Sequence, residues 1–224
     1  MTRKRTRTLG ALLALGLVFA LLGATASADG AKRELTAEEQ YAQAKGALLY
    51  IRSYYQSGGL KTTGSGFVVS ADGLAVTAAH VIDKAAKVAA VTPDGKELDC
   101  AVVSSDAATD VAVLRLPKGK YAALTLASAS PNGGALLRAM GYPLKDTLVI
   151  TEGVVAAPEG MVSEKRRMLV TCDVVNGMSG GPVFDRFGQV VGVCSGSVRT
   201  MDGIHLSARW TDLNAAVNGK EAAK

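Results

Sequence analysis

Hydrophobic residues along most of the chain occur in short runs that turn-forming residues separate. Asp72-Gly73 and Asp94-Gly95 mark two of these turns, because glycine adopts the backbone angles that a tight hairpin requires. The runs that this pattern predicts as strands are Leu48–Ile51, Gly66–Val69, Leu74–Thr77, Lys87–Val91, Cys100–Val103, Val111–Leu116, Ala135–Met140, Thr147–Ile150, Met168–Thr171, Val183–Phe184, Val190–Val193 and Ile204–Leu206. Such strands indicate an all-β sandwich or barrel fold rather than alternating βα units.

Helix signals occur near both ends of this β-rich region. Thr36 and Glu39 form a Thr-x-x-Glu capping box before an alanine-rich stretch, which predicts a short helix ahead of the first strand. Thr211 is predicted to cap a last helix over residues 212–217.

Residues 1–28 are typical of a secretory signal peptide. Basic residues at positions 3–7 precede the apolar stretch Leu9–Leu22, and Ala26-Ser27-Ala28 matches a small-residue cleavage site. The apolar stretch is shorter than the ~20 residues of a membrane-spanning helix. We therefore expect cleavage, export to the periplasm or the extracellular space, and no stable membrane association afterwards.

Removal of this segment changes what the charge implies. The formal net charge falls from +5 to +1, because residues 1–28 hold four basic residues and no acid. A nearly neutral mature chain gives no reason to expect nucleic acid as a partner. The basic cluster Glu164–Arg167 is interpreted as a solvated loop.

Three cysteines, Cys100, Cys172 and Cys194, would remain in an exported chain, where a disulfide is permitted. Cys172 and Cys194 lie on two predicted strands on either side of Ser179, so they are either a disulfide pair or two buried, inert thiols. With two histidines and no Cys-x-x-Cys motif, the chain offers no metal-ligand set, and no metal or cofactor is expected.

A histidine and an acid accompany two of the predicted strands. His80 follows an apolar strand among small residues, and the pKa of a free imidazole near neutrality suits a general base. Asp110 directly precedes Val111–Leu116, where a carboxylate is held well enough to orient an imidazole. Asp106 is a nearby rival, but it does not adjoin the strand.

The most informative segment of the chain is residues 176–182, Asn-Gly-Met-Ser-Gly-Gly-Pro, which holds Ser179 among glycines ahead of an apolar strand. Glycine permits the close backbone approach that an exposed nucleophile needs. The amide groups of such a turn are able to converge on one point and stabilise an oxyanion.

The order His80, Asp110, Ser179 and the motifs around these residues resemble the trypsin-like serine proteases, in particular their bacterial HtrA/Deg-type branch. Four segments carry the resemblance: residues 64–69, 77–81, 109–114 and 177–182. Gly141-Tyr142-Pro143 and Gly153-Val154-Val155 match further landmarks of that branch.

This resemblance implies two six-stranded antiparallel barrels with the active site between them. On this basis the predicted organisation is an N-terminal helix and first strand over residues 29–57, a first barrel over 58–127, and a second barrel with a C-terminal helix over 128–224. Ser128–Gly134 is the predicted boundary between the two β halves.

The resemblance also implies roles for single residues. The catalytic residues would be His80, Asp110 and Ser179, with the backbone amides of Gly177 and Ser179 as the oxyanion hole. Asp173, Ser195 and Gly196 would line the substrate pocket, whose small residues leave the preferred side chain open. Asp173 would either select Lys or Arg or serve the hydrogen bonds of its own loop.

The sequence departs from the family pattern at Met178, where Asn or Asp is usual before the serine. Only 45 residues follow Ser179, so the peptide-binding PDZ domain common in HtrA proteins is not expected. The leading hypothesis is an exported serine endopeptidase acting on polypeptides. The alternatives are an inactive trypsin-fold binding or scaffold protein and a glutamyl-type endopeptidase.

Overall fold

The computed structural model describes residues 32–198 and 200–221, and it confirms the all-β prediction. The predicted signal peptide, residues 1–28, lies outside the described residues. The strands of the first sheet are β1 (Leu48–Tyr54), β2 (Leu60–Val68), β3 (Leu74–Thr77), β4 (Lys87–Val91), β5 (Glu97–Asp106) and β6 (Val111–Arg115). Those of the second are β7 (Leu136–Leu144), β8 (Thr147–Val162), β9 (Lys165–Val170), β10 (Pro182–Asp185), β11 (Val190–Ser197) and β12 (His205–Ala208).

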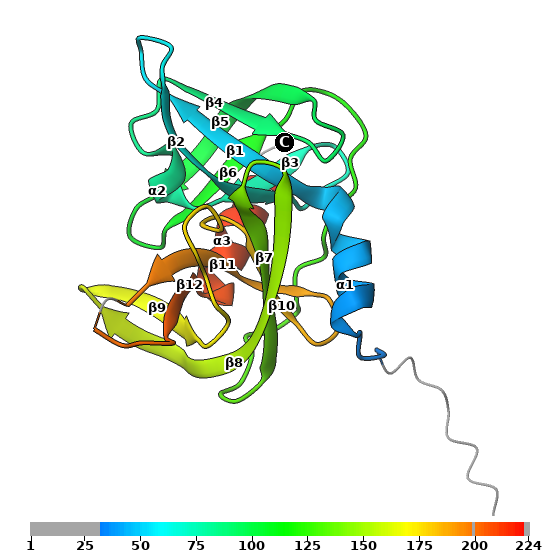
Figure 1. Cartoon of the computed structure of the whole chain (residues 1–224), viewed down its shortest axis with the longest axis vertical. Helices are drawn as coiled ribbons and strands as arrows, with labels where there is room; N and C mark the ends of the chain where they lie inside the picture. The colour runs from blue at the N-terminus through cyan, green and yellow to red at the C-terminus, as the bar shows by residue number, and fades with distance from the viewer. Residues whose placement is uncertain (1–31, 199, 222–224) are drawn as a thin grey trace, which may run out of the picture. The chain divides into compact units, whose positions relative to one another are not determined.

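Both sheets are antiparallel and close into barrels, which leaves no free sheet edge (Figure 1). The strand order is β1-β2-β3-β6-β5-β4 in the first barrel and β10-β11-β12-β9-β8-β7 in the second. Pairing of β1 with β4 closes the first barrel, and pairing of β10 with β7 closes the second. The first barrel therefore includes β1 and begins at Leu48, before the boundary at residue 58 that the sequence suggests.

Along the strands of the first barrel, side chains point alternately into the barrel and away from it. Where this barrel meets the second, both sets of side chains are buried. Leu49 and Ile51 of β1 point into the first barrel, whereas Leu48 belongs to a core that both barrels share. The same alternation occurs in β6, as expected for the two-residue period of a strand. The shared core joins Phe67 and Val113 of the first barrel to second-barrel side chains such as Phe184.

The helix α1 (Ala37–Ala44) forms where the capping box predicts it. The Thr36 hydroxyl accepts a hydrogen bond from the Glu39 amide, and the Glu39 carboxylate accepts one from the Thr36 amide. A 3-10 turn, η1 (Lys45–Ala47), leads from α1 into β1. The helix is fixed to the second barrel by Gln40, whose side-chain oxygen accepts a hydrogen bond from Arg138 of β7 at 2.9 Å.

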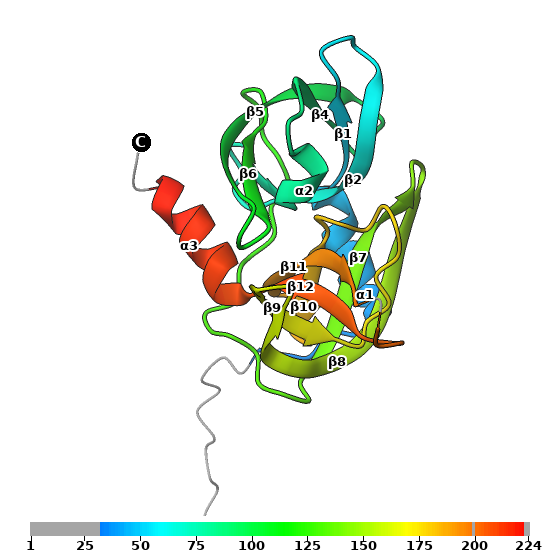
Figure 2. The same ribbon diagram turned by 90° about the vertical axis from the view of Figure 1, so that its left-hand side faces the viewer.

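The last helix, α3 (Trp210–Glu221), begins two residues earlier than predicted, and the predicted cap Thr211 lies inside it. Arg209 anchors this start instead: its carbonyl accepts a hydrogen bond from the Leu213 amide, and its guanidinium pairs with Asp212 at 2.8 Å. Leu213 and Val217 pack into the core that the barrels share. The helix lies beside β6 and β11, at the left edge of the view in Figure 2.

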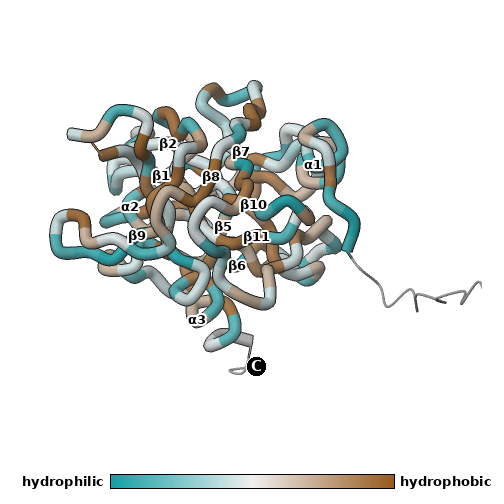
Figure 3. The backbone as a smooth tube through the Cα atoms, turned by 90° about the horizontal axis from the view of Figure 1, so that it is seen from below, coloured by the Kyte–Doolittle hydropathy of each residue, from teal (hydrophilic) through white to brown (hydrophobic). Residues whose placement is uncertain are grey.

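Hydropathy along the backbone follows this architecture. Hydrophobic segments gather along the central strands, and hydrophilic segments follow the outer loops (Figure 3). Among the described helices, none is long and apolar enough to cross a membrane.

Candidate active site

The short helix α2 (Ala79–Ile82) carries His80 beside the end of β3. The amide of Ala79 donates a hydrogen bond to the Asp110 carbonyl at 3.2 Å, which holds the start of α2 against the segment before β6. Asp110 itself has a φ of 60°, in the left-handed region that Asp and Asn tolerate better than most residues.

Asp110, and not its rival Asp106, faces the histidine. The Nδ1 atom of His80 lies 2.9 Å from Oδ2 and 3.0 Å from Oδ1 of Asp110, and the His80 amide donates to Oδ1 at 3.0 Å. The Asp106 carboxylate is used within its own turn, where it accepts hydrogen bonds from Ala108 and Thr109.

A third donor reaches Asp110 from the second barrel. The Ser195 hydroxyl of β11 donates to Oδ2 of Asp110. Ser195 was predicted to line the substrate pocket, so this role of its hydroxyl was missed. Only the closure of the two barrels brings these residues together, and no local signal in the sequence marks the contact.

These contacts set the charge of the Asp110 carboxyl. Burial favours the neutral acid, but hydrogen bonds from His80 and Ser195 outweigh this effect and hold the pKa of Asp110 below its usual value. A carboxylate only accepts hydrogen bonds, so it requires the proton of a neutral His80 to reside on Nδ1. The Nε2 atom is then left as the basic position of the ring.

The turn that holds Ser179 is built on glycines in the left-handed region. Gly177 has a φ of 94° and Gly180 a φ of 88°. A Cβ at Gly180 would overlap the Ser65 carbonyl and would lie 2.8 Å from the Ala78 amide, two residues before His80. Because both the conformation and the space exclude a side chain, the turn can pack directly against the segment that carries the histidine.

Ser179 itself is half-buried, and its carbonyl accepts a hydrogen bond from the Ser65 amide at 2.7 Å. Within residues 32–198 and 200–221, its hydroxyl forms no hydrogen bond with His80. The structure thus joins His80 to Asp110 directly, and it packs the turn that holds Ser179 against the segment just before His80. Contacts between nucleophile and base often tighten only when substrate is bound.

The predicted oxyanion hole has its amides available. Neither Gly177 nor Ser179 donates its backbone N–H to another described residue. The Ser65 hydroxyl donates to the Gly177 carbonyl at 2.8 Å and accepts from the Tyr142 amide at 2.8 Å. Ser65 therefore orients the Gly177 peptide, a role that the sequence did not reveal.

Met178 directs its side chain away from the site. It is fully buried in the second barrel, in the same cluster as Cys172 and Val191. A buried carboxylate would need a partner in this apolar cluster, whereas methionine packs there without one. The unusual residue before Ser179 thus serves as part of the core.

Asp173 does not lie at the base of an enclosed pocket. Its side chain is 76% exposed, and Oδ1 lies 3.4 Å from Nε2 of His205. The backbone of the same loop is held by Thr151, which donates to the Asp173 carbonyl at 2.8 Å, and by His205, whose Nδ1 accepts from the Val174 amide at 3.2 Å. This arrangement favours the second of the two roles expected for Asp173, support of its own loop.

Gly196, the other predicted pocket residue, borders open space: a Cβ there would meet no atom within 4 Å.

The basic cluster predicted as a solvated loop is partly a contact between the barrels. Arg167 of β9 is buried and donates to the Ala108 carbonyl at 2.8 Å, and Lys165 donates to the Ala107 carbonyl at 2.9 Å. Both carbonyls lie in the turn before Asp110. The interpretation was wrong for Arg167, which is buried, whereas Lys165 is exposed as expected; both acceptors lie about sixty positions away in the chain.

All three cysteines are free thiols in the structure, so the alternative of a Cys172–Cys194 disulfide is not formed. Burial raises the pKa of the Cys100 and Cys172 thiols to about 12 and that of Cys194 further still. Among the residues that the structure describes, no group of three or more metal-ligating side chains gathers at one point.

Comparison with known proteins agrees with this geometry. The family model described as "Trypsin-like peptidase domain" matches residues 64–193, which include all three predicted catalytic residues. Among curated proteins, the chain is 34% identical over 139 residues to a "Probable periplasmic serine endoprotease DegP-like" from Halomonas elongata, and 35% identical over 136 residues to a protein of the same name from Brucella suis.

These relatives are much longer than the matched region. The matches cover 60% and 58% of this chain but 29% and 26% of the relatives, so the chain spans less than a third of their length.

Among solved structures, the active form of the Rv3671c protease from M. tuberculosis superposes with a TM-score of 0.71 at 26% identity, covering 80% of this chain and 82% of that one. A serine endoprotease from Yersinia pestis superposes with a TM-score of 0.71 at 23% identity, over 84% of this chain and 67% of that one, and supports the fold.

Proposed function

Since the chain belongs to the trypsin-like peptidase family, we propose that it is a serine endopeptidase that cleaves polypeptides through His80, Asp110 and Ser179. The observation that carries the proposal is the hydrogen-bonded pair of His80 Nδ1 and Asp110, with the glycine turn of Ser179 packed against the segment just before His80. The mechanism follows from the atoms that this pair leaves free to react, above all Nε2 of His80.

In the first step the Ser179 Oγ attacks the carbonyl carbon of the scissile peptide bond, and Nε2 of His80 takes its proton. Asp110 remains ionised and stabilises the imidazolium that forms, because its carboxylate faces Nδ1. His80 then protonates the leaving amine, which leaves an acyl-enzyme. Water, activated by the same Nε2, hydrolyses the acyl-enzyme and restores Ser179.

The tetrahedral intermediate carries a negative oxygen that needs donors. The free amides of Gly177 and Ser179 supply two, and loss of one such donor in other enzymes costs roughly 3–4 kcal/mol of transition-state stabilisation. Ser65 supports this hole through its hydrogen bond to the Gly177 carbonyl, since that bond fixes the plane of the neighbouring peptide.

Export belongs to the same proposal. The composition of residues 1–28 supports a secretory signal peptide, and the relatives from Halomonas and Brucella carry the word periplasmic in their names. We therefore place the mature enzyme in the periplasm or outside the cell.

Covalent labelling tests the proposed nucleophile. A fluorophosphonate probe should label the folded wild-type chain at Ser179, and Ser179→Ala should abolish the label. Ser195→Ala is the comparison variant: it removes another hydroxyl next to Asp110 but leaves the nucleophile, so the label should be taken up more slowly and not lost. A folded wild-type chain that takes up no label would favour the inactive scaffold protein instead.

Cleavage of a mixed peptide library would then define the preferred side chain before the cleaved bond. Because the Asp173 carboxylate is exposed beside His205, we expect no strict requirement for Lys or Arg there. Strict cleavage after Lys or Arg that disappears in Asp173→Ala would contradict this.

A further inference from the structure

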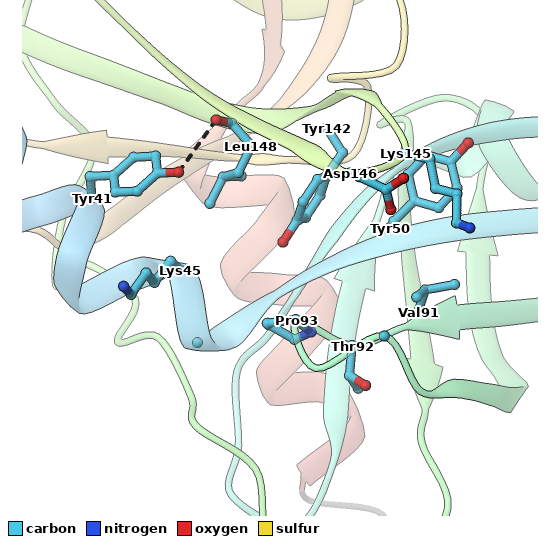
Figure 4. Close-up of a pocket in the computed structure, with 12 residues that line it drawn as sticks. Tyr41, Lys45, Tyr50, Val91, Thr92, Pro93, Tyr142, Lys145, Asp146 and Leu148 are labelled. Carbon is cyan, nitrogen blue, oxygen red and sulfur yellow. Dashed lines mark hydrogen bonds between the residues drawn. The ribbon is translucent and has the colours of Figure 1, made fainter.

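A groove lined by tyrosines lies outside the catalytic residues, where α1 and β1 meet the hairpin between β7 and β8. Its cavity measures about 470 Å³. Tyr41, Tyr50 and Tyr142 form its aromatic walls, and Lys45 and Lys145 stand at its rim (Figure 4). We call these five residues, with the space between them, the tyrosine groove.

Hydrogen-bonding groups in the groove are available to a ligand. The rings of Tyr50 and Tyr142 pack edge to face with centroids 6.3 Å apart. Among described residues, the hydroxyls of Tyr50 and Tyr142 have no hydrogen-bond partner, whereas Tyr41 donates to the Leu148 carbonyl at 3.5 Å. A phenol both donates and accepts, so these two hydroxyls suit carboxylates and peptide groups alike.

The charge of the groove is positive. Lys45 and Lys145 are exposed and form no ion pair with any described residue, and Asp146 is the acid that lines the same cavity. A second cavity of about 420 Å³ adjoins the first and shares Gly46, Thr92 and Pro93 with it. That cavity adds three lysines, Lys96, Lys118 and Lys120, and a single acid, Asp94.

Asp94 is ionised and offsets only one of these positive charges. Thr92 donates to it through the side-chain hydroxyl, and this hydrogen bond lowers the pKa of Asp94. The two cavities together present five lysines against two aspartates along one continuous track.

The groove is connected to the catalytic loop through one residue. The Tyr142 amide donates to the Ser65 hydroxyl, which in turn donates to the Gly177 carbonyl. A Cβ at Gly177 would lie 2.7 Å from the Tyr142 carbonyl. The backbone of Tyr142 thus contacts the proposed oxyanion hole, while the residue also lines the groove.

We propose that the tyrosine groove is an exosite that binds an acidic, extended segment of a polypeptide substrate. Carboxylates of the segment would pair with Lys45 and Lys145 in charge-assisted hydrogen bonds, and the hydroxyls of Tyr50 and Tyr142 would bond its backbone. This inference rests on the proposed protease function for the identity of the ligand as a substrate.

The rings of the groove favour a peptide over a nucleic acid. Single-stranded nucleic acids need open aromatic faces on which bases stack. The Tyr50 ring is nearly buried, with Tyr142 at one side and the Arg52 guanidinium 5.8 Å from its centroid. It therefore offers its hydroxyl to a ligand rather than its face.

Binding to the Ser179→Ala chain tests the exosite without any catalysis. Fluorescence anisotropy is measured with a labelled Glu-rich peptide and with the same peptide carrying Gln in place of Glu. The Glu-rich peptide should bind more tightly, and its affinity should fall as salt is added. Adding Lys45→Gln and Lys145→Gln should raise its Kd about tenfold, because two charge contacts are lost.

The matched control adds Lys84→Gln and Lys87→Gln to the Ser179→Ala chain. This pair changes the net charge equally but lines neither cavity. The proposal is overturned if both double substitutions weaken binding alike, or if the Glu-rich and Gln-rich peptides bind alike or not at all. It is also overturned if a single-stranded oligonucleotide displaces the labelled Glu-rich peptide at a lower concentration than the unlabelled Glu-rich peptide does.

Turnover gives a second readout in the active chain. Lys45→Gln with Lys145→Gln should raise KM about tenfold for a fluorogenic peptide with a Glu-rich extension and leave kcat unchanged. A short peptide without the extension should be cleaved as by the wild type. If the wild-type chain takes up no fluorophosphonate label but the Glu-rich peptide still binds selectively, the protease function is contradicted and the peptide site is not. If the chain is labelled but binds the peptides without selectivity, only the exosite is contradicted.

Discussion

Asp110 has an unfavourable backbone conformation and a buried charge, and its hydrogen bonds stabilise both. Its left-handed backbone and its buried carboxylate both oppose folding. Three donors offset these costs: the amide of His80, its Nδ1–H and the hydroxyl of Ser195. The contact of Asp110 with Nδ1 also holds the imidazole in one orientation, so at this residue the contacts that stabilise the fold also prepare the proposed base.

Asp110→Asn should reduce kcat about 10⁴-fold, the loss known when a triad aspartate is replaced in this way. The new amide donates toward Nδ1 and stabilises the wrong tautomer of His80. Steady-state hydrolysis of a fluorogenic peptide provides the measurement. Asp106→Asn is the matched control and should keep kcat within a few-fold of wild type; equal losses in both variants would argue that Asp106 shares the orienting role.

The depressed pKa of Asp110 also predicts how stability depends on pH. A carboxyl whose pKa is lower in the folded chain contributes stability above its unfolded pKa of about 3.9, and this contribution is lost as pH falls through the folded value. The difference in unfolding free energy between wild type and Asp110→Asn should therefore shrink as pH is lowered from about 6 to about 3. Urea unfolding at a series of pH values measures it, and a constant difference would contradict the prediction.

At the scale of elements, α1 is connected to the second barrel and leads directly into the first. Arg138 links the helix to β7 by hydrogen bonds to Gln40 and to the Leu35 carbonyl. The helix also supplies Tyr41 and, with η1, Lys45 to the tyrosine groove. Its position therefore matters for the proposed exosite as well as for the core.

Thr36→Ala should lower the free energy of unfolding by about 1 kcal/mol, because it removes the N-cap of α1. Urea denaturation followed by far-ultraviolet circular dichroism gives the value. Thr36→Ser keeps a capping hydroxyl and should cost much less. Equal losses for the two substitutions would show that the methyl group, and not the cap, is what matters.

Over the whole molecule, the two barrels share one hydrophobic core. Phe67 and Val113 from the first barrel lie in one cluster with Phe184 and Val193 from the second and with Leu213 from α3. Separating the barrels would expose this cluster to water, at a cost that grows with the apolar area uncovered. The same contact holds together the two barrels that carry the proposed catalytic residues.

This shared core predicts that the barrels unfold in one cooperative transition. Cys100 lies in the first barrel and Cys172 in the second, and the raised pKa of about 12 keeps each thiol protonated and slow to react in the folded chain. Thiol labelling across a urea series, mapped by mass spectrometry, should expose both cysteines over the same range, together with the change in fluorescence of Trp210. Labelling of Cys100 at lower urea than Cys172 would show that the barrels unfold independently.

Local patterns in the sequence were sufficient for most strands and for the identity of the proposed catalytic residues. Alternation of side chains marks the strands, the capping box marks α1, and glycines that permit left-handed backbone mark the Ser179 turn, since each of these effects acts within a few residues. The length of β8 was underestimated, because Gly153, Pro158 and Gly160 interrupt the apolar pattern beyond Ile150, whereas pairing with β7 and then β9 continues the strand.

Only the tertiary structure determined the contacts between residues that lie far apart in the chain. The Ser195 hydroxyl meets Asp110 across 85 positions, and Arg167 reaches the Ala108 carbonyl across 59. The groove of Tyr41, Tyr50 and Tyr142 likewise draws on three separate elements. Residue type determines which bonds a side chain is able to make, but closure of the barrels and burial of their common core determine which partner lies within reach.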